Sequence, residues 1–426
     1  MRQKAFFEPQ LLSATSGGRL VELLKRFKDY PTNVNDVQFY KTDHEHIGEG
    51  TPLAPNGTCT DPFKVPNSDR TLCVLAGRID VGRHYILTGG LQGAREPFEY
   101  LVSRVQSFGR YVFSIDEYPE AKGLFDDPRF LNLARSVCPA HKQHLDPFQF
   151  NFIVQLPGQT VAAHIDGAYF WGATRFQYPQ WLLAAMVFSN RFAERFVDQV
   201  QVVAYLHEWE PSTRRRSATG GGAGEFVHWA AGNGPPSVET PHPLAGSAID
   251  GSKSVHAAEV YLGSSSSPSL PLIDRNKRNV LSYEGPADKQ GWALRVDGEV
   301  VRRYDTDDLR VSIVYRARCF ETAEEAARFG GNGGPAEQQL SLDHILRTLA
   351  DEMVKRGKVA SVEAAMALDR RALAVKMMDT FIQYPLPSSE AAVVPFNYCA
   401  LPRILPTWAA PAATALLSPL CRPSWV

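Results

Sequence analysis

Residues 148–166 read FQFNFIVQLPGQTVAAHID, and at this stretch the chain changes character. The first half is rich in aromatic and β-branched residues, which favour a strand. Pro157-Gly158 then marks a turn, and TVAAHID resumes an extended pattern. Because residues two apart on a strand point to the same face, the side chains of His164 and Asp166 are expected to converge on one point.

Short strand-like runs separated by turn residues continue to residue 320. They are predicted at 197–209, 226–229, 246–250, 255–262, 279–283, 292–296, 299–304 and 309–316. Asp297-Gly298, between two alternating runs, is the strongest hairpin signal in the chain. Many short strands with few helices predict an antiparallel sandwich or barrel.

The segments on either side have other patterns. The first 147 residues read as a mixed α/β region packing on the core, with helical periodicity at 17–30 and 98–108. After residue 320, helices are predicted at 322–328, 341–355 and 361–382, with Ser341 and Ser361 as N-caps. We therefore expect three parts: residues 1–147, a β-rich core at 148–320, and a helical region at 321–426 that ends in a Pro/Ala-rich tail.

The charge balance excludes some partners. The 426 residues carry 45 Lys and Arg against 46 Asp and Glu, a formal net charge of −1. Nucleic acid and anionic membranes both demand a basic surface, so neither is expected as the main partner. No window has the run of 18 or more apolar residues that a spanning helix needs, and no secretory signal is apparent at the N-terminus. A small molecule or a peptide is the expected partner, and the oligomeric state is open.

The six cysteines, at positions 59, 73, 138, 319, 399 and 421, show no CxxC pair and no regular spacing. This pattern argues against a disulfide framework and against a thiolate zinc site. We therefore expect reduced thiols and an intracellular, cytoplasmic protein.

The His164-Ile165-Asp166 motif points to a metal. An imidazole and a carboxylate on one face suit a divalent ion such as Fe(II). The tripeptide also arises by chance in a chain with 11 histidines, and the alternative is a half-buried histidine beside a strand-end aspartate. His256, which follows the Asp250-Gly251 turn at the head of another apolar run, offers a third ligand on a later strand. Two histidines and one carboxylate leave three positions open on octahedral iron.

Arg310 and Ser312 share a face of the last predicted strand, LRVSIVYRARCF (309–320). A guanidinium beside a hydroxyl suits a ligand carboxylate, which arginine binds with two parallel hydrogen bonds. The alternative is that Arg310 lies on a solvated face.

The order of these motifs resembles that of the Fe(II)/2-oxoglutarate-dependent oxygenases. On an all-β segment, an HxD motif is followed by a distal histidine after Asp-Gly and then by an R-x-S motif. The LPGQ lead-in at 156–159 is similar to prolyl- and aspartyl-hydroxylase-like members. The resemblance covers residues 148–320 and implies an α+β fold with a double-stranded β-helix (jelly-roll, cupin-like) core flanked by N- and C-terminal helices.

The resemblance also implies the site. Iron would be held by His164, Asp166 and His256, with 2-oxoglutarate chelating it and O2 as co-reactant. Arg310 would bind the far carboxylate of 2-oxoglutarate, with Ser312 assisting. Members of the family usually place this arginine much closer to the distal histidine. Two explanations are therefore open. The intervening residues are an insertion between the last two strands, or Arg275 or Arg278 binds the cosubstrate carboxylate instead of Arg310.

The predicted function is a dioxygenase (an oxidoreductase) that hydroxylates an unidentified substrate and releases succinate and CO2, with no catalytic side chain beyond the metal centre. One or two residues of the aromatic run at 169–181 are expected to line the substrate pocket. Two alternatives stay open: a metal-dependent cupin-like enzyme that does not use 2-oxoglutarate, and a non-catalytic jelly-roll binding module.

Overall fold

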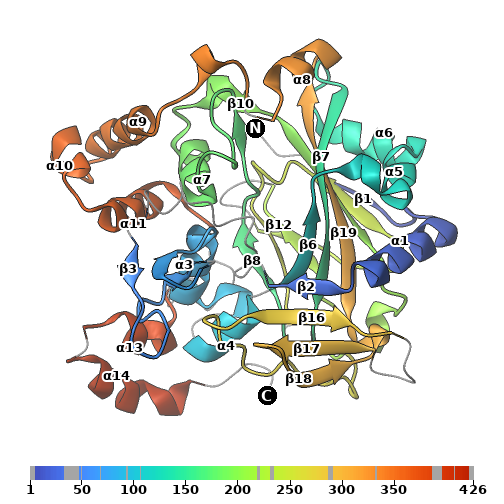
Figure 1. Ribbon diagram of the computed structural model, residues 1–426, viewed down its shortest axis with the longest axis horizontal. Helices are drawn as coiled ribbons and strands as arrows, with labels where there is room; N and C mark the ends of the chain where they lie inside the picture. Colours follow the sequence, from blue (N-terminus) through green and yellow to red (C-terminus); the bar gives the residue numbers. More distant parts are fainter. Residues whose placement is uncertain are drawn as a thin grey trace.

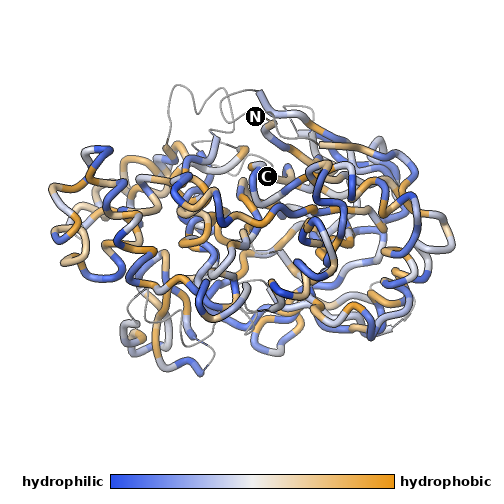
Figure 2. The backbone as a smooth tube through the Cα atoms, turned by 90° about the horizontal axis from the view of Figure 1, so that it is seen from above, coloured by the Kyte–Doolittle hydropathy of each residue, from blue (hydrophilic) through white to orange (hydrophobic). Residues whose placement is uncertain are grey.

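The computed structural model describes residues 5–421, except 33–47, 49, 68, 93–94, 106, 218–220, 231–234, 286–290, 332, 386–395 and 407. Two antiparallel sheets at its centre enclose a cavity between them, since residues of both sheets line it. Figure 1 shows helices α9–α11 at one end of the molecule and α1, α5 and α6 at the other. Figure 2, turned by 90°, shows hydrophobic and hydrophilic residues alternating along the helices at the left end.

The larger sheet has six strands, in the order β1-β14-β11-β19-β7-β6. Their bounds are β1 Ala5–Glu8, β14 Gly246–Ile249, β11 Gln199–Tyr205, β19 Arg310–Phe320, β7 His144–Gln155 and β6 Phe108–Val112. All 11 residues of the central strand β19 are buried. Its register places Ser312 opposite Tyr205 of β11 and Ile153 of β7.

The alternation in the quoted stretch explains how β7 is used. Phe150, Phe152 and Val154 belong to the main core cluster, which the sheet forms with α1 (Ala14–Phe27), α5 (Pro119–Phe125) and α6 (Pro128–Val137). Gln149, Asn151 and Ile153 point the other way and line the cavity. One face of the strand therefore builds the core, and the other faces the cavity.

The smaller sheet has four short strands, in the order β13-β12-β15-β8. Their bounds are β13 Ser237–Glu239, β12 Phe226–His228, β15 His256–Ala258 and β8 Val161–His164. His164 and His256 are direct partners in the β8–β15 ladder. Along the sequence the chain alternates between the two sheets: β7, β11, β14 and β19 belong to the larger one, and β8, β12–β13 and β15 fall between them.

A third sheet separates β15 from β19 along the chain. It is formed by β16 (Asn279–Tyr283), β17 (Trp292–Val296) and β18 (Glu299–Tyr304), with β2 (Asp29–Pro31) added at one edge. The predicted β17–β18 hairpin is confirmed, and both turn residues have positive φ, 51° at Asp297 and 93° at Gly298. The residues between the distal histidine and Arg310 thus form a unit outside the two central sheets.

Two small sheets complete the strands. One contains β3 (Thr51–Pro52), β5 (Leu72–Leu75) and β4 (Lys64–Pro66), and the other β9 (Tyr169–Phe170) and β10 (Phe196–Val197). Helices α3 (Ile79–Thr88) and α4 (Phe98–Arg104) pack near β8, because buried residues of both helices share a small core cluster with Ala162 of β8.

The C-terminal region is helical, as predicted. It contains α8 (Ala323–Phe329), α9 (Leu342–Lys355), α10 (Val362–Met366), α11 (Arg370–Phe381), α13 (Leu401–Ile404) and α14 (Ala410–Leu417). The hydroxyls of Ser341 and Ser361 cap α9 and α10. The single helix predicted at 361–382 is in fact two, because a new helix starts after the N-cap Asp369.

Helix α7 (Gln180–Ser189) is a helix that the periodicity did not indicate. Most of its residues are buried, and it packs with α9 and α11 in the second core cluster. A helix that is apolar on all sides has no amphipathic period to detect.

The expectation of reduced cysteines is wrong, because all six are paired. The disulfides are Cys59–Cys73, Cys138–Cys319 and Cys399–Cys421, with partners 14, 181 and 22 residues apart. Only the fold brings these partners together, so their spacing carries no signal. The cytoplasmic location rested on free thiols and loses that support.

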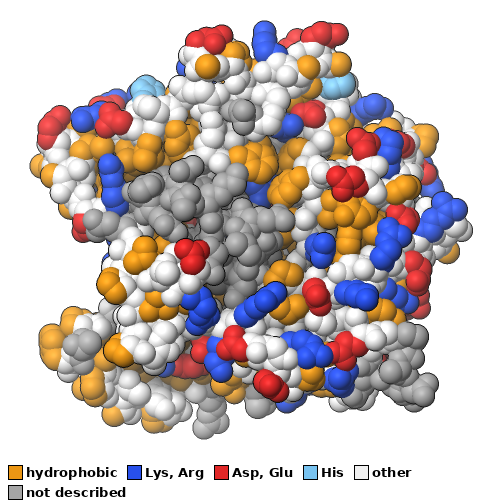
Figure 3. Space-filling view, viewed as in Figure 1, with side chains coloured by type: hydrophobic (Ala, Val, Ile, Leu, Met, Phe, Trp, Pro, Cys, Tyr) orange, Lys and Arg blue, Asp and Glu red, His pale blue; other side chains and the backbone are white. Residues whose placement is uncertain are grey.

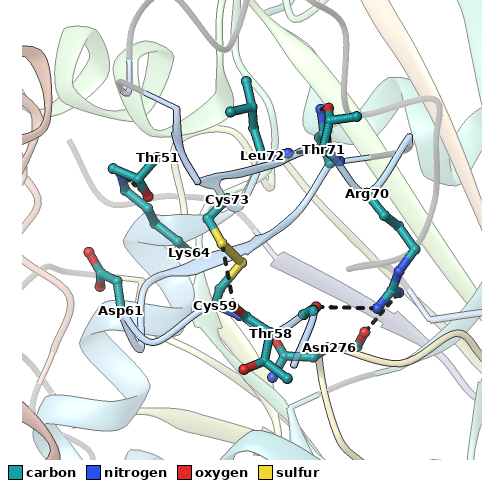
Figure 4. Close-up of a disulfide and its surroundings, with 12 residues drawn as sticks. Thr51, Thr58, Cys59, Asp61, Lys64, Arg70, Thr71, Leu72, Cys73 and Asn276 are labelled. Carbon is teal, nitrogen blue, oxygen red and sulfur yellow. Dashed lines mark hydrogen bonds between the residues drawn. A yellow bond between two sulfur atoms is a disulfide. The ribbon is translucent and has the colours of Figure 1, made fainter. Parts of the chain in front are cut away.

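Hydrogen bonds next to the first disulfide join the small sheet of β3, β4 and β5 to a distant segment. Figure 4 shows Asn276, which precedes β16, beside Cys59–Cys73. The Cys59 backbone N–H donates to Asn276 Oδ1 at 3.0 Å, and Arg70 donates to the Asn276 carbonyl at 2.9 Å. The third sheet and the N-terminal region are thus joined next to this disulfide.

None of the helices in the described part of the chain has the length and apolar run that crossing a bilayer requires. Figure 3 shows acidic and basic side chains interspersed over one face rather than gathered by sign.

Candidate metal centre

Three of the residues predicted from the sequence meet at one point. His164 is the last residue of β8, Asp166 follows two positions later, and His256 is the first residue of β15. One ligand atom from each lies within 4.8 Å of the other two. The Nε2 atoms of His164 and His256 lie 3.8 and 3.9 Å from oxygens of the Asp166 carboxylate. All three side chains are buried.

The backbone holds Asp166 close to the strand that carries His256. Its N–H donates to the Gly251 carbonyl at 2.7 Å. A Cβ on Gly251 would lie 2.3 Å from Asp166 Oδ2 and 3.0 Å from the His256 ring. The glycine of the Asp250-Gly251 turn is therefore needed for the close approach of the carboxylate.

Backbone carbonyls orient both imidazoles. His164 Nδ1 lies 2.7 Å from the Ala162 carbonyl, and His256 Nδ1 lies 3.0 Å from the Ser254 carbonyl. A carbonyl only accepts, so each Nδ1 carries the proton and each Nε2 keeps its lone pair. The Gln201 amide lies 3.3 Å from His256 Nε2. Both lone pairs are on the side where the three ligands meet.

Burial and charge set the protonation states that a metal requires. Burial lowers the pKa of His164 far below its usual value, and the charges of Arg78 and His256 lower it further. Burial also lowers the pKa of His256, although Asp166 opposes this. For Asp166, burial alone would raise the pKa, but Arg316 and then His256 outweigh it and bring it below the usual value. Neutral imidazoles and an ionised carboxylate are the forms that bind metal.

The donor set fits a divalent ion. Asp166 Oδ2 is buried and has no hydrogen-bond partner. A buried carboxylate oxygen without a hydrogen bond is costly, even with an arginine at ion-pair distance, and a cation bound between it and the two Nε2 atoms would satisfy it. Two nitrogens and one oxygen on one side suit Fe(II) with open positions for further ligands.

Arg316 is a residue of the site that the sequence analysis missed. Its Nη2 lies 3.5 Å from Asp166 Oδ2 and donates to the Gly167 carbonyl at 3.4 Å. It lies on β19, on the same face as Arg310 and Ser312, since all three have even numbers. That parity was a signal available in the sequence.

Arg310 and Ser312 lie in the same cavity as the three candidate ligands, and both are buried. Arg310 donates to Gln155 Oε1 at 2.5 Å, and its guanidinium lies 5.1 Å from the centre of the Tyr205 ring. Its Nε is buried without a partner. Gly224, at φ +76°, packs against this side chain, and a Cβ there would come within 2.7 Å of it. The solvated-face alternative for Arg310 is excluded.

The two rival arginines have other surroundings. Arg275 also lines the cavity, but its guanidinium donates to the carbonyls of Cys59, Asp61 and Lys64. Arg278 is exposed, and its backbone N–H donates to the Asp297 carboxylate. Of the three arginines, Arg310 both lines the cavity and has a buried side-chain donor without a partner, whereas Arg275 has its donors engaged and Arg278 does not line the cavity.

The cavity has a volume of about 220 Å³ and two kinds of wall. Polar residues of β7, β11 and β19 form one side, and apolar residues of α3 and α4 form another. None of the aromatic residues at 169–181 is among the described residues that line the cavity, although Arg175 and Gln180 of that stretch are. Its aromatic lining comes from Phe63, Tyr111, Tyr205 and Phe226.

Searches with the whole chain find similarity in solved structures only, since no family model and no curated protein matches. A prolyl hydroxylase from Trichoplax adhaerens, solved with a hypoxia-inducible-factor peptide, is 9% identical with a TM-score of 0.31, covering 76% of this chain and 86% of its own. A Pseudomonas putida prolyl-4-hydroxylase is 10% identical with a TM-score of 0.27, covering 74% and 92%.

A 2OG-Fe(II) oxygenase family protein from Burkholderia pseudomallei is 12% identical with a TM-score of 0.26, covering 54% of this chain and 71% of its own. The family named by these structures is the one that the sequence motifs resemble. At these TM-scores the assignment of the site rests on its own geometry.

Proposed function

We propose that this protein is an Fe(II)- and 2-oxoglutarate-dependent dioxygenase that hydroxylates a second substrate and releases succinate and CO2. The observation that carries the proposal is the buried cluster of His164, Asp166 and His256, with Arg310 and Ser312 in the same cavity. Two of the metal ligands lie at strand ends of the smaller sheet, with Asp166 two residues beyond β8, and the candidate cosubstrate residues lie on the larger sheet. Both sets line one cavity.

The strand order supports a double-stranded β-helix for the core. The chain alternates between the two facing sheets. In the larger sheet the four strands concerned have the order β14-β11-β19-β7, and in the smaller sheet the order is β13-β12-β15-β8. We assign residues 148–320 to this core, with residues 263–308 as an insertion between its last two strands. The 1–147 and 321–426 regions are then additions that pack on it.

The chain's own residues have separable tasks in this reaction. His164, Asp166 and His256 would hold Fe(II), which with 2-oxoglutarate supplies the activation of O2 coupled to decarboxylation. Arg310 would bind the far carboxylate through its fork of N–H donors, with the Ser312 hydroxyl as a further donor. Arg316 would keep Asp166 ionised and oriented. The apolar helices α3 and α4 would exclude water from the second substrate.

Anaerobic titration with Fe(II) and then 2-oxoglutarate tests the proposal. A weak visible charge-transfer band on adding 2-oxoglutarate is expected for the chelate. The band should need a higher 2-oxoglutarate concentration in Arg310→Met, while Arg278→Met, at an exposed arginine, serves as the matched control. Iron binding without the band would favour a cupin-like enzyme that does not use 2-oxoglutarate. Absence of iron binding would favour a binding module.

A further inference from the structure

The cavity around the metal ligands is strongly basic. Among the described residues that line it, the only carboxylate is that of Asp166. Five arginines line it, and these are Arg78, Arg175, Arg275, Arg310 and Arg316. The two positive charges of a bound Fe(II) would balance the two negative charges of 2-oxoglutarate. The excess of arginine charge over carboxylate charge in the cavity wall would therefore remain.

Four of the five arginines have their charge or donors engaged. Arg275 donates to three backbone carbonyls, Arg316 faces Asp166, and Arg175 donates to Gln149 Oε1. Arg310 is the candidate for 2-oxoglutarate, so this step rests on the proposed function. Arg78 remains as a cationic group in the cavity wall without a role.

Arg78 has donors without acceptors. It precedes α3, and both its Nε and its Nη2 are buried with no hydrogen-bond partner. Asp80 is close in sequence, but its carboxylate accepts from the Tyr384 hydroxyl, and no ion pair to Arg78 is present in the described part of the chain. Unsatisfied buried donors on a charged group are costly, so a cavity that leaves them open is suited to an anionic ligand.

Arg78 lines the same cavity as the candidate metal ligands His164 and Asp166. Arg175 lines this cavity too, and it donates to Gln149 Oε1 at 2.8 Å. An anion bound at Arg78 would therefore share the cavity with the metal and lie within the field of a second arginine.

The wall next to Arg78 is apolar. Ile79, Val81 and Ile86 of α3 line the cavity, and Val102 of α4 joins them. A ligand with its charged group at Arg78 would lay the rest of its body against this surface.

We propose that the second substrate is a small organic anion, with a carboxylate or phosphate head bound by Arg78 and an apolar body packed on α3 and α4. The charged head orients the substrate, and the apolar body lies beside the metal. Neutral analogues of the same shape bind weakly, because they leave the Arg78 donors unpaired.

Calorimetric titration of matched probes tests this. The protein is loaded anaerobically with Mn(II) and one equivalent of 2-oxoglutarate, then titrated at constant ionic strength with hexanoate, hexyl phosphate or hexanamide. We expect at least one anion to bind tenfold or more tightly than hexanamide, and the tighter of the two identifies the head group. Equal affinity for all three probes would overturn the proposal.

Variants locate the anion. Arg78→Met should reduce the affinity for the preferred anion at least tenfold, and Arg78→Lys should retain part of it. Arg83→Met is the matched control, because Arg83 lies on the same helix but pairs with Asp379 away from the cavity; its affinity should stay within twofold. Undiminished binding by folded Arg78→Met would contradict the assignment.

The same samples separate this proposal from the function on which it rests. If 2-oxoglutarate fails to bind the Mn(II) protein, but the anion still binds in an Arg78-dependent manner, the oxygenase proposal fails and the anion site stands. If 2-oxoglutarate binds but the protein shows no preference for the anionic probes, the anion site fails and the oxygenase proposal stands.

Discussion

The two central sheets hold their parts of the site in different ways. In the smaller sheet, His164 and His256 lie at the ends of strands of four and three residues, and the register shifts just after His256. In the larger sheet, Arg310, Ser312 and Arg316 belong to one strand of 11 buried residues with a neighbour on each side. Side chains at short strand ends contribute little to the core, whereas the odd-numbered residues that alternate with Arg310, Ser312 and Arg316 on β19 belong to the main core cluster. Substitutions should therefore separate function from stability in one sheet and couple them in the other.

Removing a metal ligand should have the largest effect on activity. His164→Ala, Asp166→Ala and His256→Ala are each expected to abolish turnover and metal binding, because two remaining ligands hold iron poorly. The fold should persist, with stability changed by about 1–2 kcal/mol. Metal content, succinate production and thermal unfolding measure the three effects. A variant with near-wild-type iron and turnover would show that its residue is not a ligand.

Arg310→Ala should raise the half-saturation concentration of 2-oxoglutarate by one to three orders of magnitude. The range follows from losing a charge-assisted bidentate pair, which contributes about 1.5–3 kcal/mol, and more where water is excluded. Iron affinity should hardly change, and Arg310→Lys should recover part of the loss. Titration of 2-oxoglutarate in the turnover assay measures this. A defect in Arg278→Ala, with none in Arg310→Ala, would invalidate the role given to β19.

Asp166→Glu keeps the charge but moves the carboxylate. One added methylene shifts it by about 1 Å, a displacement that can cost catalysis about two orders of magnitude. The close packing of Gly251 against Asp166 leaves little room for this shift. Turnover per bound iron is the relevant measurement, because it distinguishes misplaced iron from lost iron. Wild-type turnover per iron would show that the site is more adaptable than its packing indicates.

Arg275→Ala should produce the opposite pattern to Arg310→Ala, although both arginines line the cavity. Loss of its bonds to three backbone carbonyls should lower the free energy of unfolding by about 2–3 kcal/mol. The half-saturation concentration of 2-oxoglutarate should stay within about twofold, since those donors are already used. Chemical denaturation measures the free energy of unfolding, and the same turnover assay measures the half-saturation concentration of 2-oxoglutarate. Unchanged stability with a large cosubstrate defect would reassign the cosubstrate site to Arg275.

The sequence predicted those parts of the molecule in which local pattern and tertiary environment agree. The alternation at 148–155 yields β7 because one of its faces is core and the other is cavity. Asp297-Gly298 yields a hairpin because its backbone preference is local. Because residues 310, 312 and 316 are all even-numbered, the alternation along the strand also predicts that Arg316 lies on the same face as Arg310 and Ser312.

Other features depend on the fold as a whole. Arg78 follows a turn-rich segment whose pattern does not show that it lines the same cavity as the metal ligands. Helix α7 is buried on all sides, so it lacks a detectable period. Cys138 and Cys319 are 181 residues apart, and only the packing of the end of α6 against β19 brings them together. These are long-range contacts, for which no short window of sequence contains the information.

If the protein is the ferrous enzyme proposed above, its three disulfides impose a condition on how it is handled. Iron must be kept in its reduced state, while the cysteine pairs must stay oxidised. Thiol reagents attack disulfides by exchange, whereas a one-electron donor such as ascorbate reduces Fe(III) without entering that exchange. Ascorbate is therefore the suitable reductant, and dithiothreitol is not. In a cell, the same two requirements are met only where dithiols are oxidised and ferrous iron is supplied.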